Sequence, residues 1–193
     1  MKKIDKETIV FFASGSGSNV QNIVEYFRGK ERDITFKVLC NNPQAGVLER
    51  CKKLGVESVV FDKKAFRETG EVLQLLQSLQ PNLIVLAGFL WLMPMEIIQA
   101  FPNKIINIHP ALLPKFGGKG MYGMHVHHAV IQNKEVETGI TIHYVNEHYD
   151  DGKVILQASC PVDESDTPET IAQKVHKLEY LHFPRAVEKE LWG

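Results

Sequence analysis

The fold class can be inferred from one segment near the N-terminus, Thr8-Ile9-Val10-Phe11-Phe12-Ala13-Ser14-Gly15-Ser16-Gly17-Ser18-Asn19. Its first five residues are almost continuously apolar, as expected for a strand that is covered on both faces. A glycine-rich turn follows, and residues 20–27 then show a helical period. A buried strand that leads through a tight turn into a helix is typical of a βαβ unit. The segment therefore predicts an α/β protein.

The turn at residues 15–19 also predicts an anion-binding site. Its backbone N–H groups converge at the start of a helix, where Ser18 or Asn19 is expected to be the N-cap. A dinucleotide fingerprint would require a third glycine in place of Val20 and an acidic residue in place of Asn41-Asn42. We therefore interpret the turn as a loop for a single phosphate. The alternative is a tight turn that needs glycine only for its geometry.

Strands and helices alternate along the rest of the first half of the chain. Strands are expected at 35–40, 56–61, 83–87 and 104–108, and helices at 43–54, 71–79 and 95–100. This alternation implies right-handed crossovers and a mostly parallel, twisted sheet with helices on both faces. Ligands of such sheets bind beyond the carboxyl ends of the strands, which here are residues 13–19, 88–93 and 107–109.

The second half of the chain predicts an antiparallel extension of the sheet. Residues 138–145 alternate between apolar and polar, residues 154–160 form a further strand, and Asp151-Gly152 between them is a turn signal. The last helix is expected to begin with Thr167 as N-cap and Pro168 at N1, and to end or kink at Pro184, with residues 186–192 continuing helically. Since no repeat or linker interrupts the chain, we predict a single domain at 1–193.

The composition limits the kinds of molecule and the compartment that are expected for this protein. The chain has 193 residues, a formal net charge of −1, 44% hydrophobic and 23% charged residues, so electrostatics recommends neither nucleic acid nor a membrane as partner. Three widely spaced cysteines, Cys40, Cys51 and Cys160, are expected to be free thiols, which fits a reducing compartment. No signal-peptide profile or segment long enough to span a membrane is evident, so we expect a cytoplasmic protein.

Catalytic chemistry is indicated by Asn107-Ile108-His109-Pro110-Ala111-Leu112-Leu113-Pro114. In an extended segment Asn107 and His109 point the same way, which sets an amide donor beside an imidazole at the end of a strand. Asp150 lies in the link between the last two strands, free to reach a histidine. The alternatives are polar residues that satisfy loose backbone groups and, for Asp150, an Asx turn.

Two other segments have open interpretations. Residues 88–93 are apolar where a loop is usually polar, which favours either core packing or a pocket for a flat aromatic ligand. Residues 117–123 hold four glycines and form a mobile, anion-friendly loop, which is followed by His125, His127 and His128. No cysteine or carboxylate lies close to these histidines, so a role at an entrance or in the loop is favoured over a metal site.

These features together resemble the glycinamide ribonucleotide formyltransferases along essentially the whole chain. The resemblance rests on the turn at 15–19, Ala87-Gly88-Phe89, residues 107–114, His143, residues 150–157 and Glu179. The run Asn-x-His-Pro-x-Leu-Leu-Pro is specific to the wider folate-dependent formyl-transfer superfamily, while the early glycine turn and the short length favour this branch. Two features depart from many relatives: Trp91 in place of a basic residue, and a longer loop at 117–123.

The resemblance implies a Rossmann-like formyltransferase fold and transfer of the formyl group of 10-formyltetrahydrofolate to the amine of glycinamide ribonucleotide, in de novo purine biosynthesis. It implies small-molecule substrates only, no metal, and a monomer or homodimer. The implied catalytic residues are Asn107, His109 and Asp150. The implied ribonucleotide contacts are Gly17, Ser18, Asn19, His176 and Glu179. The implied folate contacts are Lys64, Leu90, Trp91, Leu92, Met93, Asn107, Asn146, Glu147, His148, Tyr149 and Asp150.

Two rival interpretations of the sequence remain. One is an enzyme of the same superfamily that acts on a different amine, such as that of a nucleotide sugar, and the glycine turn argues against it. The other is a phosphate-binding module without catalytic activity, and the combination of Asn107, His109 and Asp150 argues against that.

Overall fold

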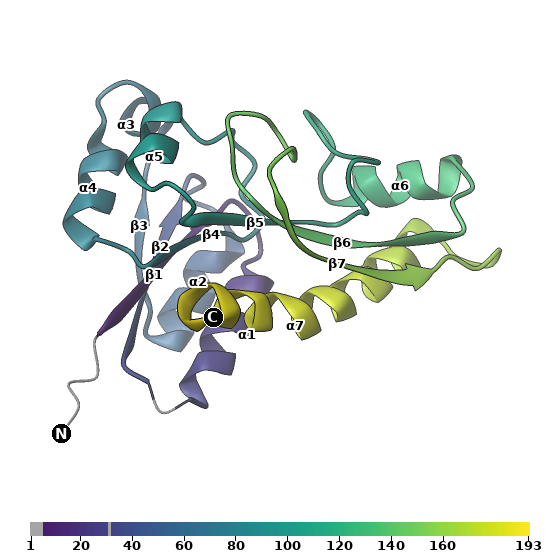
Figure 1. Cartoon of the computed structure of the whole chain (residues 1–193), viewed down its shortest axis with the longest axis horizontal. Helices are drawn as coiled ribbons and strands as arrows, with labels where there is room; N and C mark the ends of the chain where they lie inside the picture. The colour runs from purple at the N-terminus through teal and green to yellow at the C-terminus, as the bar shows by residue number, and fades with distance from the viewer. Residues whose placement is uncertain (1–5, 31) are drawn as a thin grey trace.

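The computed structural model describes residues 6–30 and 32–193. Within these residues one seven-stranded sheet runs in the order β3-β2-β1-β4-β5-β6-β7 (Figure 1). The strands are β1 (Glu7–Ala13), β2 (Ile34–Cys40), β3 (Glu57–Val60), β4 (Leu83–Leu86), β5 (Ile105–His109), β6 (Glu137–Tyr144) and β7 (Val154–Pro161). Strands β1 to β5 pair in parallel, whereas β6 and β7 are antiparallel. The predicted mostly parallel sheet with a C-terminal antiparallel hairpin is confirmed.

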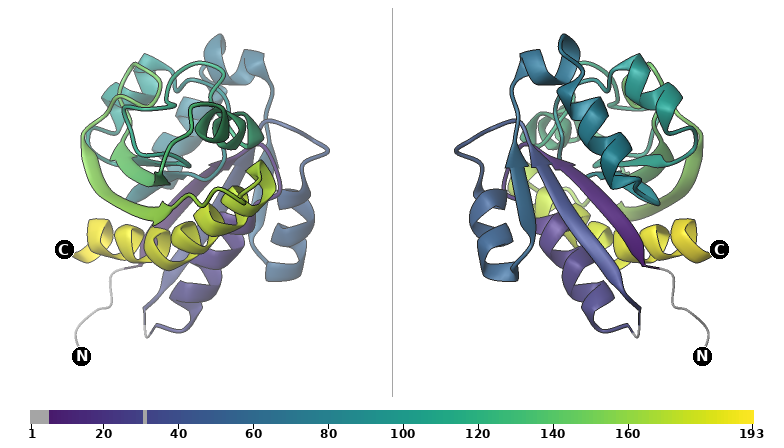
Figure 2. Two further views of the ribbon diagram at one scale, coloured as in Figure 1. Left: turned by 90° about the vertical axis from the view of Figure 1, so that its right-hand side faces the viewer. Right: turned by 90° about the vertical axis from the view of Figure 1, so that its left-hand side faces the viewer.

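Helices cover both faces of this sheet, as predicted. They are α1 (Ser18–Arg28), α2 (Gly46–Leu54), α3 (Lys63–Arg67), α4 (Glu71–Leu79), α5 (Met95–Ala100), α6 (Met124–Gln132) and α7 (Pro168–Trp192). Strand β1 shows why two layers form: Ile9 and Phe11 pack with α1, α2 and α7, whereas Val10 and Phe12 pack with α3, α4 and α5. Figure 2 shows α7 alongside α1 on one face, with α3 and α4 on the other.

Several local expectations need correction. Helix α1 begins at Ser18 and its N-cap is Gly17, at φ 75°, so neither Ser18 nor Asn19 is the cap. The Asn19 side chain instead donates to a carboxylate on α7. Helix α2 begins at Gly46 rather than at residue 43, because the Asn42 side chain and carbonyl accept the N–H groups of the next residues in a turn.

Two helices were not predicted. Helix α3 follows Asp62, whose side chain accepts the Ala65 N–H at 2.7 Å, an N-cap signal that the sequence contained. Helix α6 contains the three histidines after the glycine loop. The predicted cap of α7 is confirmed, since Thr167 accepts the Thr170 N–H and Pro168 follows. However, α7 does not end at Pro184, which is buried within one continuous helix.

The strand order reverses between β1 and β4, and this reversal determines where on the sheet a ligand site is expected. The chain leaves the carboxyl ends of β1, β4 and β5 at the same edge, where parallel sheets bind their ligands.

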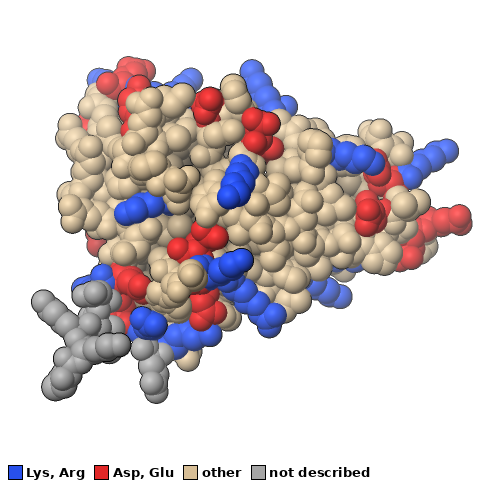
Figure 3. All heavy atoms as spheres, viewed as in Figure 1, with Lys and Arg blue, Asp and Glu red and all other residues tan. Residues whose placement is uncertain are grey.

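Acidic and basic side chains are interspersed on the face of the molecule shown in Figure 3. Of the helices in residues 6–30 and 32–193, none is both long and apolar enough to cross a membrane.

Candidate active site

A cavity of about 560 Å³ lies beyond the carboxyl ends of β1, β4 and β5, within the size range usual for small-molecule sites. Its walls bring together the three predicted strand ends, the glycine-rich loop and part of α7. The lining residues that carry polar groups include Ser18, Asn19, Asn107, His109, His127, Asp150, His176 and Glu179. The cavity thus unites the predicted catalytic and anion-binding segments.

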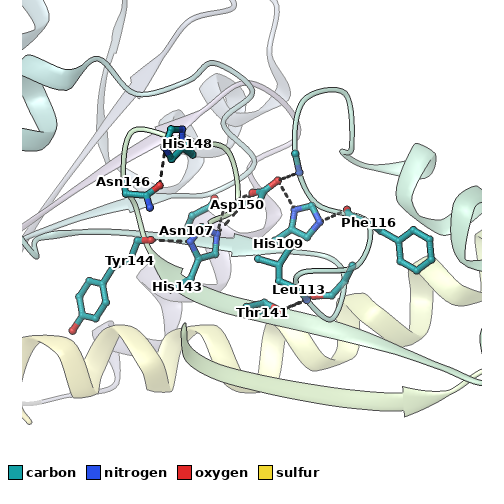
Figure 4. A network of polar contacts seen from close by, with 12 residues as sticks. Asn107, His109, Leu113, Phe116, Thr141, His143, Tyr144, Asn146, His148 and Asp150 are labelled. Carbon is teal, nitrogen blue, oxygen red and sulfur yellow. Dashed lines mark hydrogen bonds and ion pairs between the residues drawn. The ribbon is translucent and has the colours of Figure 1, made fainter. Parts of the chain in front are cut away.

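Strand β5 ends with Asn107 and His109 on one face, as the alternation predicts. Asp150 reaches both of them from the β6–β7 link: its Oδ2 lies 3.4 Å from His109 Nδ1, and its Oδ1 lies 3.5 Å from Asn107 Nδ2 (Figure 4). The backbone N–H of Gly118 also donates to Asp150 Oδ2 at 2.9 Å. The predicted approach of Asp150 to a histidine is therefore present, and it is not an Asx turn.

The electrostatics of Asp150 follow from this setting. Burial would raise the pKa of its carboxyl, but the hydrogen bond and charge of His109, the Gly118 N–H and the charge of His143 outweigh burial and hold the pKa below its usual value. Asp150 is therefore a carboxylate at neutral pH. His109 is 3% exposed, and its Nε2 lies 2.7 Å from the Phe116 carbonyl oxygen. Both ring nitrogens thus face oxygen atoms that can accept a hydrogen bond.

His143 completes the network, and it is a residue that the sequence reasoning did not assign to the site. Strand register sets it opposite Asn107. Burial lowers the pKa of His143, although the Tyr144 carbonyl and Asp150 oppose the shift. The neutral ring donates from Nδ1 to the Tyr144 carbonyl at 2.8 Å, so Nε2 accepts from Asn107 Nδ2 at 3.1 Å. The second Asn107 N–H has only the long Asp150 contact and is available to a substrate oxygen.

Loss of this orienting bond gives a first prediction. His143→Ala should lower kcat about tenfold. Complete loss of a positioned oxyanion donor costs about 10²–10³ in rate, and the loss here is smaller because Asn107 keeps its amide donor and loses only its fixed orientation. Steady-state kinetics would show the effect mainly in kcat. The exposed His128 on α6 is a suitable control histidine, and an equal loss in His128→Ala would contradict the role of His143.

The opposite end of the cavity is built from the glycine turn and α7. Asn19 Nδ2 donates to Glu179 Oε2 at 2.9 Å, and both side chains are buried. Burial raises the pKa of Glu179, while the Asn19 hydrogen bond and the charges of His176 and His109 oppose this shift. His176 and Glu179 therefore border the cavity beside the turn.

The predicted folate contacts divide into two groups. Leu90, Tyr149, Asp150 and Asn107 line the cavity. The rest lie outside its walls: Lys64, Trp91, Leu92, Met93, Asn146, Glu147 and His148. Trp91 packs in an aromatic cluster with Phe61, Phe66 and Phe89, and Met93 is buried beneath them. Core packing therefore accounts for much of the apolar character of residues 88–93.

Ser14, which was not predicted as a site residue, connects the ends of β1 and β4, because its side chain accepts the Leu90 N–H at 3.0 Å.

The three histidines of α6 differ in their settings. His125 and His128 are exposed, whereas His127 is 3% exposed and lines the cavity. Its Nδ1 has no hydrogen-bond partner among the described residues. Burial, reinforced by the charges of His176, His128 and His109, lowers the pKa of His127 to about 4. Within residues 6–30 and 32–193 no cluster of three or more potential metal ligands is found.

Burial of a neutral His127 predicts a pH-dependent stability. Its folded pKa is below its unfolded value, so between about pH 6.5 and 4 only the unfolded chain gains this proton, and stability falls as pH falls. We expect up to about 3 kcal/mol of the free energy of unfolding to be lost in this window through His127. Urea titrations across the window should show a smaller loss for His127→Gln, with His128→Gln unchanged from the parent. Parallel curves for parent and His127→Gln would contradict this.

Comparison with known proteins identifies the family. A family model described as "Formyl transferase" matches residues 7–187. The chain belongs to the formyl transferase family. It is 40% identical to the chloroplastic phosphoribosylglycinamide formyltransferase of Arabidopsis thaliana, over 96% of the chain and 66% of that protein. It is 38% identical to phosphoribosylglycinamide formyltransferase of Bacillus subtilis, over 94% and 93% of the two chains.

Solved structures agree with the sequence relatives. Glycinamide ribonucleotide transformylase 1 from Geobacillus kaustophilus superposes with a TM-score of 0.86 at 32% identity, over 97% of this chain and all of that one. The chain spans just under two thirds of the length of the Arabidopsis relative and nearly all of the Bacillus relative. The Rossmann-like formyltransferase fold implied by the sequence is therefore confirmed.

Proposed function

We propose that this chain transfers the formyl group of 10-formyltetrahydrofolate to the amine of glycinamide ribonucleotide. The observation that carries the proposal is the shared cavity: the Asn107–His109–Asp150 network and the glycine turn at the start of α1 line the same space. The turn suits the substrate phosphate, and the network suits attack at a carbonyl carbon. The names of the sequence relatives and solved structures support this choice of substrates.

The proposed chemistry needs no protein nucleophile. The substrate amine attacks the formyl carbon, a C–N bond forms, and negative charge develops on the formyl oxygen. Asn107 Nδ2 and His109 Nε2 donate to that oxygen, which takes the place of the Phe116 carbonyl as acceptor. Asp150 keeps His109 charged and takes the proton from the attacking amine, directly or through water. When the intermediate collapses, the bond from carbon to N10 of the folate breaks and N10 receives a proton.

The two substrates would occupy different ends of the cavity. Gly17, Ser18 and Asn19 would hold the phosphate, with His176 and Glu179 beside the ribonucleotide. Leu90, Tyr149, Asn107 and Asp150 would contact the folate within the cavity. The remaining folate contacts implied by the sequence would lie along an outer path past Trp91. Three free cysteines support a reducing compartment such as the cytoplasm.

Chelators should leave this activity unchanged, because the proposed oxyanion donors are side chains. The check is to assay the enzyme before and after dialysis against EDTA. Complete loss of activity that zinc restores would contradict the prediction and would give the α6 histidines a catalytic role.

Choice of acceptor tests the proposed function. The chain should formylate glycinamide ribonucleotide in the presence of 10-formyltetrahydrofolate, and should act far more slowly on an amino-sugar nucleotide. Preference for the sugar nucleotide would favour the rival enzyme of the same superfamily. Phosphate binding without turnover of either acceptor would favour a binding module.

A further inference from the structure

The glycine turn is fixed from beneath by helix α2. The Gly15 carbonyl accepts the Val47 N–H at 3.0 Å, and the Ser16 carbonyl accepts Arg50 Nε at 2.8 Å. Both donors belong to α2. In a trans peptide the N–H points opposite to the C=O, so these bonds turn the N–H groups of Ser16 and Gly17 away from α2. Both residues line the cavity, and neither N–H donates to an acceptor among residues 6–30 and 32–193.

Of these two bonds, the one from Arg50 depends on a side chain. The half-buried guanidinium also donates from Nη1 to the Gln21 side chain of α1, and Gln21 in turn donates to Glu25 at 2.8 Å. Arg50 therefore ties together α2, the turn and α1. Gly15 and Ser16 are exposed, whereas Gly17 is buried against Val47, so the Arg50 bond holds the exposed end of the Ser16–Gly17 peptide.

We propose that Arg50 is a positioning residue for substrate phosphate. It holds the Ser16–Gly17 peptide with the Gly17 N–H directed at the phosphate, and its charge polarises that peptide in the same sense. Arg50 does not touch the substrate, since it lies on the far side of the turn in a separate hollow with Glu49 and Lys53. The inference rests on the proposed function, because it assumes a phosphorylated substrate in the cavity.

The test compares Arg50→Gln with Lys53→Gln. Lys53 is exposed on the same helix and lines the same hollow, so its replacement removes an equal charge without touching the turn. Arg50→Gln should raise the KM for glycinamide ribonucleotide about tenfold, the loss expected for one charge-assisted hydrogen bond. The kcat and the KM for the folate should stay within about twofold, and Arg50→Lys should recover part of the loss. Lys53→Gln should match the parent.

A substrate without a phosphate distinguishes the loss of phosphate positioning from a general loss of enzyme structure. With the dephosphorylated riboside, kcat/KM should be equal in the parent and Arg50→Gln, because there is no phosphate for the glycine turn to bind. An equal loss on both substrates, or an equal effect of Lys53→Gln, would overturn the inference. If the parent formylates the ribonucleotide and Arg50→Gln has an unchanged KM, only this inference fails. If the parent does not formylate it, the proposed function fails as well.

Discussion

Asp150→Asn is expected to lower kcat by about 10²–10⁴, the range for loss of an acid–base partner. Asp150 is a carboxylate held below its usual pKa against His109, and its removal takes away the charge that favours the imidazolium. The fold should not suffer. Asp150 has φ 53°, a conformation that asparagine tolerates well, and the amide oxygen can still accept the Gly118 N–H. Kinetics and a thermal melt on the same sample would separate the two effects.

The split between kcat and KM adds a second signature to this variant. The KM values should change much less than kcat, since the interaction matters mainly in the transition state. Asp151→Asn is the matched control on an exposed neighbour. Near-parental kcat in Asp150→Asn, or a larger loss in Asp151→Asn, would show that the role is wrongly assigned.

Gly17→Ala is expected to raise the KM for the ribonucleotide at least as much as loss of Arg50. Gly17 has φ 75°, and a Cβ there would lie 2.4 Å from Val47 Cγ2 and 2.8 Å from Val47 Cα. The turn must therefore move away from α2, which displaces the N–H groups proposed to hold the phosphate. A backbone strain of about 1–3 kcal/mol should also lower the melting temperature. Substrate titrations would compare the change in KM for the ribonucleotide with the change in KM for the folate.

The control for this substitution is Gly15→Ala, in the same turn. A Cβ at Gly15 would meet no atom within 4 Å, and its φ is not in the left-handed region. Its effect should be clearly smaller. Equal increases of KM for the ribonucleotide and the folate in Gly17→Ala would mean that the turn does not act through phosphate.

Local pattern predicted most of the fold. The apolar run of β1, the glycine turn and the helical period of α1 define one βα unit with only short-range information, and the same holds for the alternation in β6. Two-residue spacing also predicted that Asn107 and His109 face the same way. The Gly17 N-cap was missed because Asn19 is a good cap by type, yet its side chain bonds to Glu179, 160 residues away.

The remaining parts of the site depend on contacts between distant segments. His143 faces Asn107 only through the register of β5 with β6, which no spacing in the sequence reveals. The Phe116 carbonyl reaches His109 through the fold of the glycine-rich loop. Likewise, Arg50 looks like an ordinary helical cation in sequence, and its bond to Ser16 becomes apparent only when α2 is packed beneath the turn.

The proposed formyl transfer can be followed at the formyl carbon itself. The enzyme would be mixed with 10-formyltetrahydrofolate labelled with ¹³C in the formyl group and with glycinamide ribonucleotide, and the carbon signal would be recorded over time. We predict that the label moves from N10 of the folate to the former amine of the ribonucleotide as a formamide, one for each tetrahydrofolate released. Label that stays on the folate, or that appears only as free formate, would contradict formyl transfer to the ribonucleotide.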